Sequence, residues 1–144
     1  MKRYFVLVLV LCFIPICSFA AGNVNDFQGA AIALGADQLD EKNAMSGGAF
    51  TKFNQDGCSV SFESNGGNIT TAIIEGDGYN FLAYCCATMY VFDKNGDQTA
   101  NMGEFLKTYL LAKNAEEYAY GKMSNGVIFF ITYENGEYSF MVTE

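Results

Sequence analysis

The residues with the most specific chemistry in this chain lie in one polar stretch, FDKNGDQTANMGEF, which runs from Phe92 to Phe105. Oxygen-bearing groups recur in it at positions one, three, five, seven, nine and twelve, counted from Asp93. A hard cation such as Ca²⁺ binds roughly six to eight oxygen ligands on a tight turn. The spacing therefore predicts a calcium site with the ligands Asp93, Asn95, Asp97, the Thr99 backbone carbonyl, Asn101 and Glu104.

This stretch resembles the EF-hand calcium loop, and Phe92 and Phe105 would end and begin its two flanking helices. It departs from the EF-hand pattern at two positions. Gln98 stands where the family has a glycine for a sharp turn, and Ala100 stands where a larger apolar residue pairs with a second loop. The sequence contains no second loop of this kind. The resemblance therefore implies weak binding, with a dissociation constant on the order of 10⁻⁴ to 10⁻³ M.

The same residues also fit a solvated turn before a helix. In that interpretation residues 93–97 form the turn, Thr99 caps the following helix, and Glu104 is an acid on the helix surface. The sequence leaves both interpretations open.

The composition argues against catalysis. The chain has no His to act as a general base. Cys85 and Cys86 are adjacent and lack the two-residue spacing of a redox motif. The glycine pairs Gly47-Gly48 and Gly66-Gly67 lack the Lys-Ser or Lys-Thr that completes a phosphate-binding loop. We therefore expect a protein that is not an enzyme and that takes no cofactor other than Ca²⁺.

The first 20 residues predict a secretory signal peptide. A basic start is followed by a short apolar run from Tyr4 to Ile16, and Ser18 and Ala20 provide the small residues of a cleavage site after Ala20. Residues 21–144 would then form a single exported domain, secreted or periplasmic. The mature chain is long enough to bury a hydrophobic core of its own.

Removal of the signal peptide makes the protein more acidic. The full chain has a net charge of −8, and cleavage also removes Lys2 and Arg3, which brings the net charge to −10. The mature chain then lacks arginine, whose guanidinium is suited to binding phosphate groups. This charge excludes nucleic acid and anionic membranes as partners and favours cations or a basic protein surface.

Three cysteines remain after cleavage. An exported compartment permits disulfides, so Cys58 could pair with Cys85 or with Cys86 if the Cα atoms lie within about 7 Å. The alternative is that all three are buried thiols.

Apolar spacing and turn residues predict an α+β fold in which helices precede antiparallel meanders. Helices are expected at residues 27–34, 80–92 and 105–113, and the last two should pack on the sheet. Strands are expected at residues 49–53, 58–63, 68–75, 117–123, 127–133 and 138–143. Cys58, Val60 and Phe62 alternate with polar residues, which predicts one buried face on that strand.

The two meanders resemble each other at an offset of 69 or 70 residues, and both contain an Asn-Gly turn. They could be two αβββ halves, residues 24–76 and 79–144, that arose by duplication. They could equally be independent hairpins that use the same turn residues.

The strand at residues 127–133 is apolar on both faces, which has two interpretations. It could be a central strand covered by helix and sheet. If one face stays uncovered, it would be a surface for another protein or for a second copy, and we expect Phe129, Phe130, Tyr133 and Tyr138 to form that surface. The sequence thus predicts a small exported acidic module that binds a protein, with weak calcium binding as the alternative.

Overall fold

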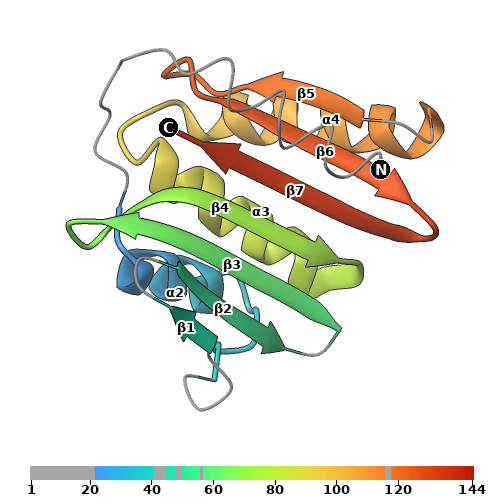
Figure 1. The fold of residues 1–144 in the computed structure, drawn as a ribbon. Helices are drawn as coiled ribbons and strands as arrows, with labels where there is room; N and C mark the ends of the chain where they lie inside the picture. Colours follow the sequence, from blue (N-terminus) through green and yellow to red (C-terminus); the bar gives the residue numbers. More distant parts are fainter. Residues whose placement is uncertain (1–21, 41–44, 48–49, 56, 116–117) are drawn as a thin grey trace.

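The chain folds into three helices and one seven-stranded antiparallel sheet in a computed structural model that describes residues 22–40, 45–47, 50–55, 57–115 and 118–144 (Figure 1). In chain order the elements are α2 (Val24–Ala33), β1 (Met45–Gly47), β2 (Phe50–Gln55), β3 (Cys58–Asn65), β4 (Asn68–Gly76), α3 (Gly78–Phe92), α4 (Gln98–Ala115), β5 (Tyr118–Lys122), β6 (Ile128–Glu134) and β7 (Glu137–Thr143). The predicted signal peptide and its cleavage site lie outside the described residues.

The sheet consists of two meanders joined at their last strands. Its order is β1-β2-β3-β4-β7-β6-β5, so β4 and β7 meet in the middle although they are far apart in the sequence. Their register runs from Thr71 opposite Thr143 to Gly76 opposite Tyr138. The two meanders therefore share one continuous sheet and one hydrophobic core.

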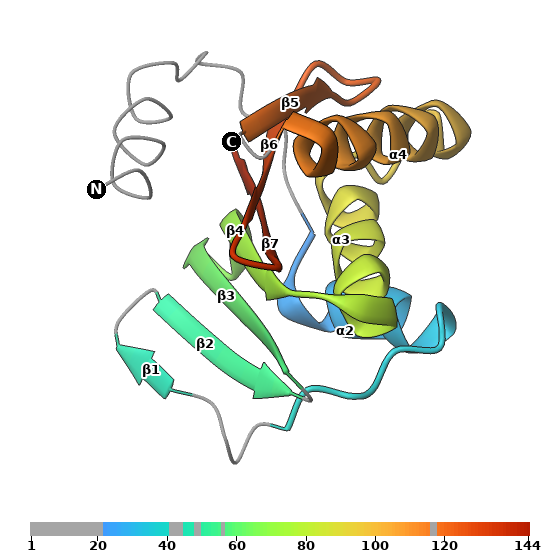
Figure 2. The same ribbon diagram turned by 90° about the vertical axis from the view of Figure 1, so that its right-hand side faces the viewer.

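All three described helices lie on the same side of the sheet (Figure 2). The inward side chains of the strands alternate with outward ones, as in Val60 and Phe62 of β3 or Phe129 and Ile131 of β6. Rings from helix and sheet interlock in this layer, and the Phe27 and Phe62 centroids are 4.8 Å apart. None of the described helices is long and apolar enough to cross a membrane.

The predicted α+β class, with helices packed on antiparallel meanders, is confirmed. The alternation predicted for β3 is confirmed too, because Cys58, Val60 and Phe62 are buried. No strand was predicted before residue 49, but the structure adds the short strand β1 there. Helix α4 begins at Gln98, seven residues before the predicted start, because polar residues can form its first turns.

The position of β6 bears on the two interpretations of this strand. Among the described elements, the helices lie on one of its faces, and β6 lies next to the edge strand β5. The described residues therefore favour the interpretation with one uncovered face, which stays a prediction.

The two meanders share their turn geometry. Gly66 and Gly67 have φ values of 59° and 87°, and Asn135 and Gly136 have 56° and 87° at an offset of 69 residues. These positive values fit two-residue hairpin turns of type I′. The β3–β4 ladder has an irregularity between Glu63 and Ser64, whereas the β6–β7 register runs without a shift. A duplication stays a prediction.

The close approach of β5 to its neighbours generates a stability prediction. A Cβ atom on Gly121 would lie 2.3 Å from Phe129 Cζ and 2.6 Å from Thr108 Oγ1. We expect Gly121→Ala to lower the free energy of unfolding by about 1–3 kcal/mol, because the buried Phe129 ring has no room to move. Urea titration of both proteins measures this difference.

Gly103→Ala is the matched control, since Gly103 lies inside α4 and a Cβ there would meet nothing within 4 Å. We expect this variant to be more stable by about 0.5–1 kcal/mol, owing to the helix propensity of alanine. Equal effects of the two variants would contradict the close packing of β5.

Candidate functional site

The connection between α3 and α4 contains the first candidate site. Helix α3 ends at Phe92 and α4 begins at Gln98, so only residues 93–97 form the loop. Asp97 caps α4, because its Oδ1 accepts a hydrogen bond from the Ala100 amide at 3.0 Å. Thr99, which the turn interpretation assigned as the cap, lies within the first turn of the helix.

Asp93 is a buried carboxylate surrounded by hydrogen-bond donors. Its side chain is 5% exposed. Its Oδ2 accepts bonds from Asn101 Nδ2 at 2.8 Å, from Ser124 Oγ at 2.5 Å and from the Asn125 amide at 3.2 Å. Hydrogen bonds to an ionised acceptor are stronger than neutral ones, so these bonds offset the cost of burying the charge.

Further bonds connect the same residues into a network. Asn101 Oδ1 accepts from the Ser124 amide at 2.7 Å, and Ser124 Oγ accepts from the Asp97 amide at 2.9 Å. Asn125 Nδ2 donates to the Phe92 carbonyl at 2.8 Å. The network thus fastens the turn between β5 and β6 to the junction of α3 and α4. We call these five residues, Asp93, Asp97, Asn101, Ser124 and Asn125, the Asp93 network.

The backbone of this loop differs from the EF-hand pattern. Asn135 is the one non-glycine residue with a positive φ in the described part of the chain, so Gln98 does not form the sharp turn of the sixth position. Its side chain instead donates to the Asp93 carbonyl at 2.5 Å. Gly96 packs directly on Asp93, because a Cβ there would lie 2.1 Å from Asp93 Oδ1.

The six predicted calcium ligands are only partly brought together. Asp93 and Asn101 bond to each other, Asp97 caps α4 and contacts Ser124 through its amide, and Asn95 is exposed. The Glu104 carboxylate contacts Lys107 Nζ at 3.4 Å. Among the described residues, no group of three or more His, Cys, Asp or Glu side chains is arranged to hold a metal ion. Calcium binding stays a prediction.

Sequence reasoning missed two members of the network. Ser124 and Asn125 lie between the strands predicted at residues 117–123 and 127–133, and no functional role was predicted for them, although they bond to Asp93 across 31 and 32 residues. No local signal distinguishes a turn serine or asparagine that faces solvent from one that bonds a distant carboxylate.

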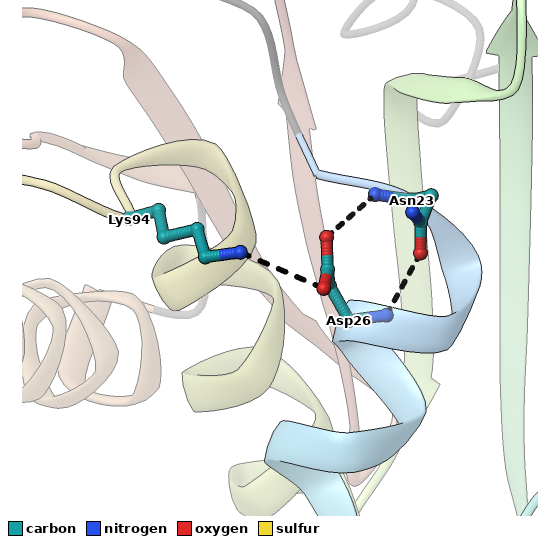
Figure 3. Close-up of polar contacts among 3 residues, drawn as sticks. All are labelled: Asn23, Asp26 and Lys94. Atoms are coloured by element: carbon teal, nitrogen blue, oxygen red, sulfur yellow. Dashed lines mark hydrogen bonds and ion pairs between the residues drawn. The ribbon is translucent and has the colours of Figure 1, made fainter.

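The start of the described chain is held next to the same loop (Figure 3). Asn23 and Asp26 form a reciprocal capping box at the beginning of α2. Asp26 also pairs with Lys94 at 3.6 Å, an exposed ion pair that contributes at most about 1 kcal/mol. The Gly22 amide donates to the Val91 carbonyl, and the Gly22 carbonyl accepts from the Ile69 amide. Residue 22 is therefore fixed to both α3 and β4.

Cys58 and Cys85 are buried, and Cys86 is partly buried. Burial raises the pKa of Cys85 well above its usual value, and the neighbouring Cys86 and Cys58 raise it further. Burial also raises the pKa of Cys86 to about 11. Thiols that stay protonated are poor nucleophiles, so this cluster does not suit covalent catalysis. A disulfide from Cys58 to Cys85 or Cys86 stays a prediction.

The second candidate site is an apolar patch on the side of the sheet away from the helices. Tyr118 and Tyr120 of β5 are 54% and 65% exposed, and Ile128 of β6 is also exposed. The rings of Tyr120 and Phe130 lie side by side, with centroids 6.4 Å apart. Met141 of β7 lies opposite Phe130, so this row of side chains continues toward the middle of the sheet. We call Tyr118, Tyr120, Ile128 and Phe130 the aromatic sheet face.

The predicted partner surface overlaps this face at one residue only. Phe129 is fully buried and Tyr138 is 5% exposed, so both are core residues. Tyr133 packs on Tyr138 with ring centroids 4.5 Å apart, on the side of the helices. Of the four predicted residues, Phe130 alone points to the open side, because side chains alternate along β6. Its neighbours Tyr118 and Tyr120 were not among the four residues predicted for the surface.

Comparison of the chain with protein-family models, with curated proteins and with solved structures finds no match. The function is therefore argued from the geometry of the chain itself.

The Asp93 network generates a prediction that separates the two interpretations of the loop. Asp93→Ala leaves several buried donors without their acceptor, so we expect the free energy of unfolding to fall by roughly 3 kcal/mol. Asn95→Ala is the control, because this exposed residue should change stability by less than about 0.5 kcal/mol. Chemical denaturation of the three proteins measures both effects.

Calcium provides the second arm of this test. A calcium site would raise the melting temperature of the wild type at millimolar Ca²⁺, and Glu104→Gln would remove that increase. Because Asp93 is bonded by donors of its own chain, we follow the turn interpretation here and expect the same melting temperature with and without Ca²⁺ for both proteins. A calcium-dependent increase that disappears in Glu104→Gln would show that the loop binds the ion.

Tyr138 generates a prediction about alkaline pH. Its hydroxyl is buried and makes no hydrogen bond to the described residues. Burial raises the pKa of this phenol, and the neighbouring Tyr109 adds to the increase. Above about pH 10 the unfolded chain loses this proton while the folded protein keeps it, so the free energy of unfolding falls as the pH rises.

We expect Tyr138→Phe to keep the ring stack on Tyr109, whose centroid is 4.3 Å away, and to reduce this alkaline loss of stability. At neutral pH the variant should be at least as stable as the wild type, because an unsatisfied buried hydroxyl is removed. Unfolding measured from pH 8 to pH 11 tests both statements. Parallel curves for the two proteins would contradict them.

Proposed function

We propose that this chain is a small exported protein-binding module, not an enzyme, and that its partner binds at the aromatic sheet face. The observation that carries the proposal is the exposure of Tyr118 and Tyr120, at 54% and 65%, beside Phe130 on the side of the sheet away from the described helices. Tyrosine is enriched at protein interfaces, where its ring buries apolar area and its hydroxyl stays hydrated.

The charge of this face supports a protein partner. The mature chain has a net charge of −10, yet Lys122 is the only charged residue of β5. On β6 the one charged residue is Glu134, at the end of the strand. Charge depletion at the centre of an aromatic patch is a property of interface cores. A solvated surface of an acidic protein would instead carry carboxylates there.

The chemistry of the buried groups supports the non-enzymatic part of the proposal. The chain has no histidine, and burial favours the neutral forms of Cys85 and Cys86. The Asp93 carboxylate is bonded by donors of its own chain. These groups stabilise the fold, and none has the geometry of a nucleophile next to a base.

Site-specific photo-crosslinking tests the proposal. We expect a benzoylphenylalanine in place of Tyr120, in the protein expressed by its own organism, to give a discrete adduct with a protein. The matched control places the probe at Leu110, which is 56% exposed on α4 on the opposite side of the sheet. Mass spectrometry of the adduct identifies the partner.

An adduct that is specific to position 120 supports the proposal. Equal adducts from positions 120 and 110, or no adduct from position 120, would contradict it.

A further inference from the structure

We propose that a second copy of this chain binds along the outer edge of β5, strand against strand, around a two-fold axis at Tyr120. This inference rests on the proposed binding function of the aromatic sheet face and names its partner. Within the dimer the two sheets would continue as one, with all helices on the same side.

The edge formed by β5 has few of the features that usually protect sheet edges. In the sheet of described strands β5 pairs with β6 alone, so one side of its backbone has no partner strand there. Its register with β6 runs through five residue pairs without a bulge, and the strand contains no proline. Natural edges are usually blunted by charged side chains, bulges, prolines or short length, and Lys122, at the end of β5, is its one charged residue. The opposite edge strand, β1, has only three residues.

Symmetry restricts the register of two paired β5 strands. Residues directly opposite each other in an antiparallel ladder point to the same face of the sheet. A two-fold axis perpendicular to the sheet leaves every side chain on its original face. Residues that lie opposite each other across the axis must then be an even number of positions apart in the sequence. One residue therefore lies on the axis, opposite its own copy. Only an axis at Tyr120 pairs all five residues of β5, from Tyr118 to Lys122.

This register places complementary side chains together on the open face. Tyr118 lies opposite Lys122 of the second copy, and Tyr120 lies opposite its own copy. A lysine ammonium beside a tyrosine ring is attracted to the face of the ring. The two lysines lie four residues apart along the ladder, or about 14 Å, so their repulsion is screened at physiological ionic strength.

The helix side of the edge is also apolar. Thr108 of α4 lies so close to Gly121 that a side chain at position 121 would have no room, so α4 lies directly over β5 there. Leu111 lies one turn after Thr108 on the same flank of α4 and is 51% exposed. A different flank of α4 faces α3, because Met102 lies on that flank and contacts Cys86 of α3. Pairing along β5 would therefore cover apolar side chains on both sides of the new ladder.

The charge of β5 permits self-association along this edge. Two copies with net charges of −10 repel each other, and they approach closely most easily where carboxylates are sparse. Strand β5 contains no acidic residue, and its only charge is the positive Lys122, although Glu116 and Glu117 directly precede it in the sequence. The strand itself therefore adds no carboxylate to the proposed contact.

Engineered cysteines test the register in the purified secreted protein. Opposite residues in an antiparallel ladder have Cα atoms about 4.5–5.5 Å apart, within the range that a disulfide spans. We expect Tyr120→Cys to form a disulfide-linked dimer on mild oxidation. We expect none from Tyr118→Cys alone, but a mixed dimer from Tyr118→Cys together with Lys122→Cys. The wild-type protein, oxidised in the same way, shows how much disulfide-linked dimer the native cysteines form by themselves.

Sedimentation gives a second readout that needs no cysteine. We expect the wild type to dimerise with rising concentration and Tyr120→Lys to stay monomeric, because two lysines would meet on the axis. Leu110→Lys also replaces an exposed apolar residue with lysine, but on α4, and this variant should dimerise like the wild type. A monomeric wild type, or equal disulfide yields from Tyr118→Cys and Tyr120→Cys, would overturn the dimer.

The test also separates this inference from the proposed function. A photo-adduct from position 120 with a different protein, together with a monomeric purified chain, overturns the dimer and keeps the binding function. The absence of any adduct from position 120, together with a monomeric chain, overturns both.

Discussion

The antiparallel ladder between β4 and β7 is the contact on which the rest of the structure depends. It joins a meander from the first half of the chain to one from the second half, through six residue pairs from Thr71–Thr143 to Gly76–Tyr138. Two separate three-stranded or four-stranded sheets would each bury little surface against one helix. Joined at β4 and β7, they present one broad inner face that buries Ile74, Phe140 and Val142 under the helices.

The described helices all lie on one side of the single sheet, so none of them covers its other side. At most positions that side carries polar residues, as in the outward Ser59, Ser61 and Glu63 of β3. Over β5 and β6 it carries tyrosine, isoleucine and phenylalanine instead. The proposed binding function follows from this local exception to the polar pattern, because exposed aromatic rings cost hydration free energy unless a partner covers them.

The Asp93 network contributes a different kind of constraint. A buried carboxylate with three donors stabilises a fold only if every donor arrives in position, so it favours one arrangement of α3, α4 and the β5–β6 turn over others. By fixing that turn, the network also sets where β5 lies against α4. Gly121 then lets β5 approach the helix closely, and this places Tyr118 and Tyr120 on the opposite, open face. The loop with calcium-like spacing thus has a structural role that is visible without any ion.

The sequence by itself determined the α+β class, the helices, the six longer strands and the places of the hairpin turns, because these depend on local periodicity and on backbone preferences within a few residues. It could show that β6 has two apolar faces, but not which face the helices cover. It therefore grouped Phe129 with Phe130, although the first is core and the second faces outward. Only the tertiary structure decided that β4 pairs with β7, that Ser124 and Asn125 bond to Asp93, and that β5 is an edge strand among the described strands. These features depend on contacts between residues far apart in the chain, and local patterns carry no information about which distant partner a strand or a carboxylate will meet.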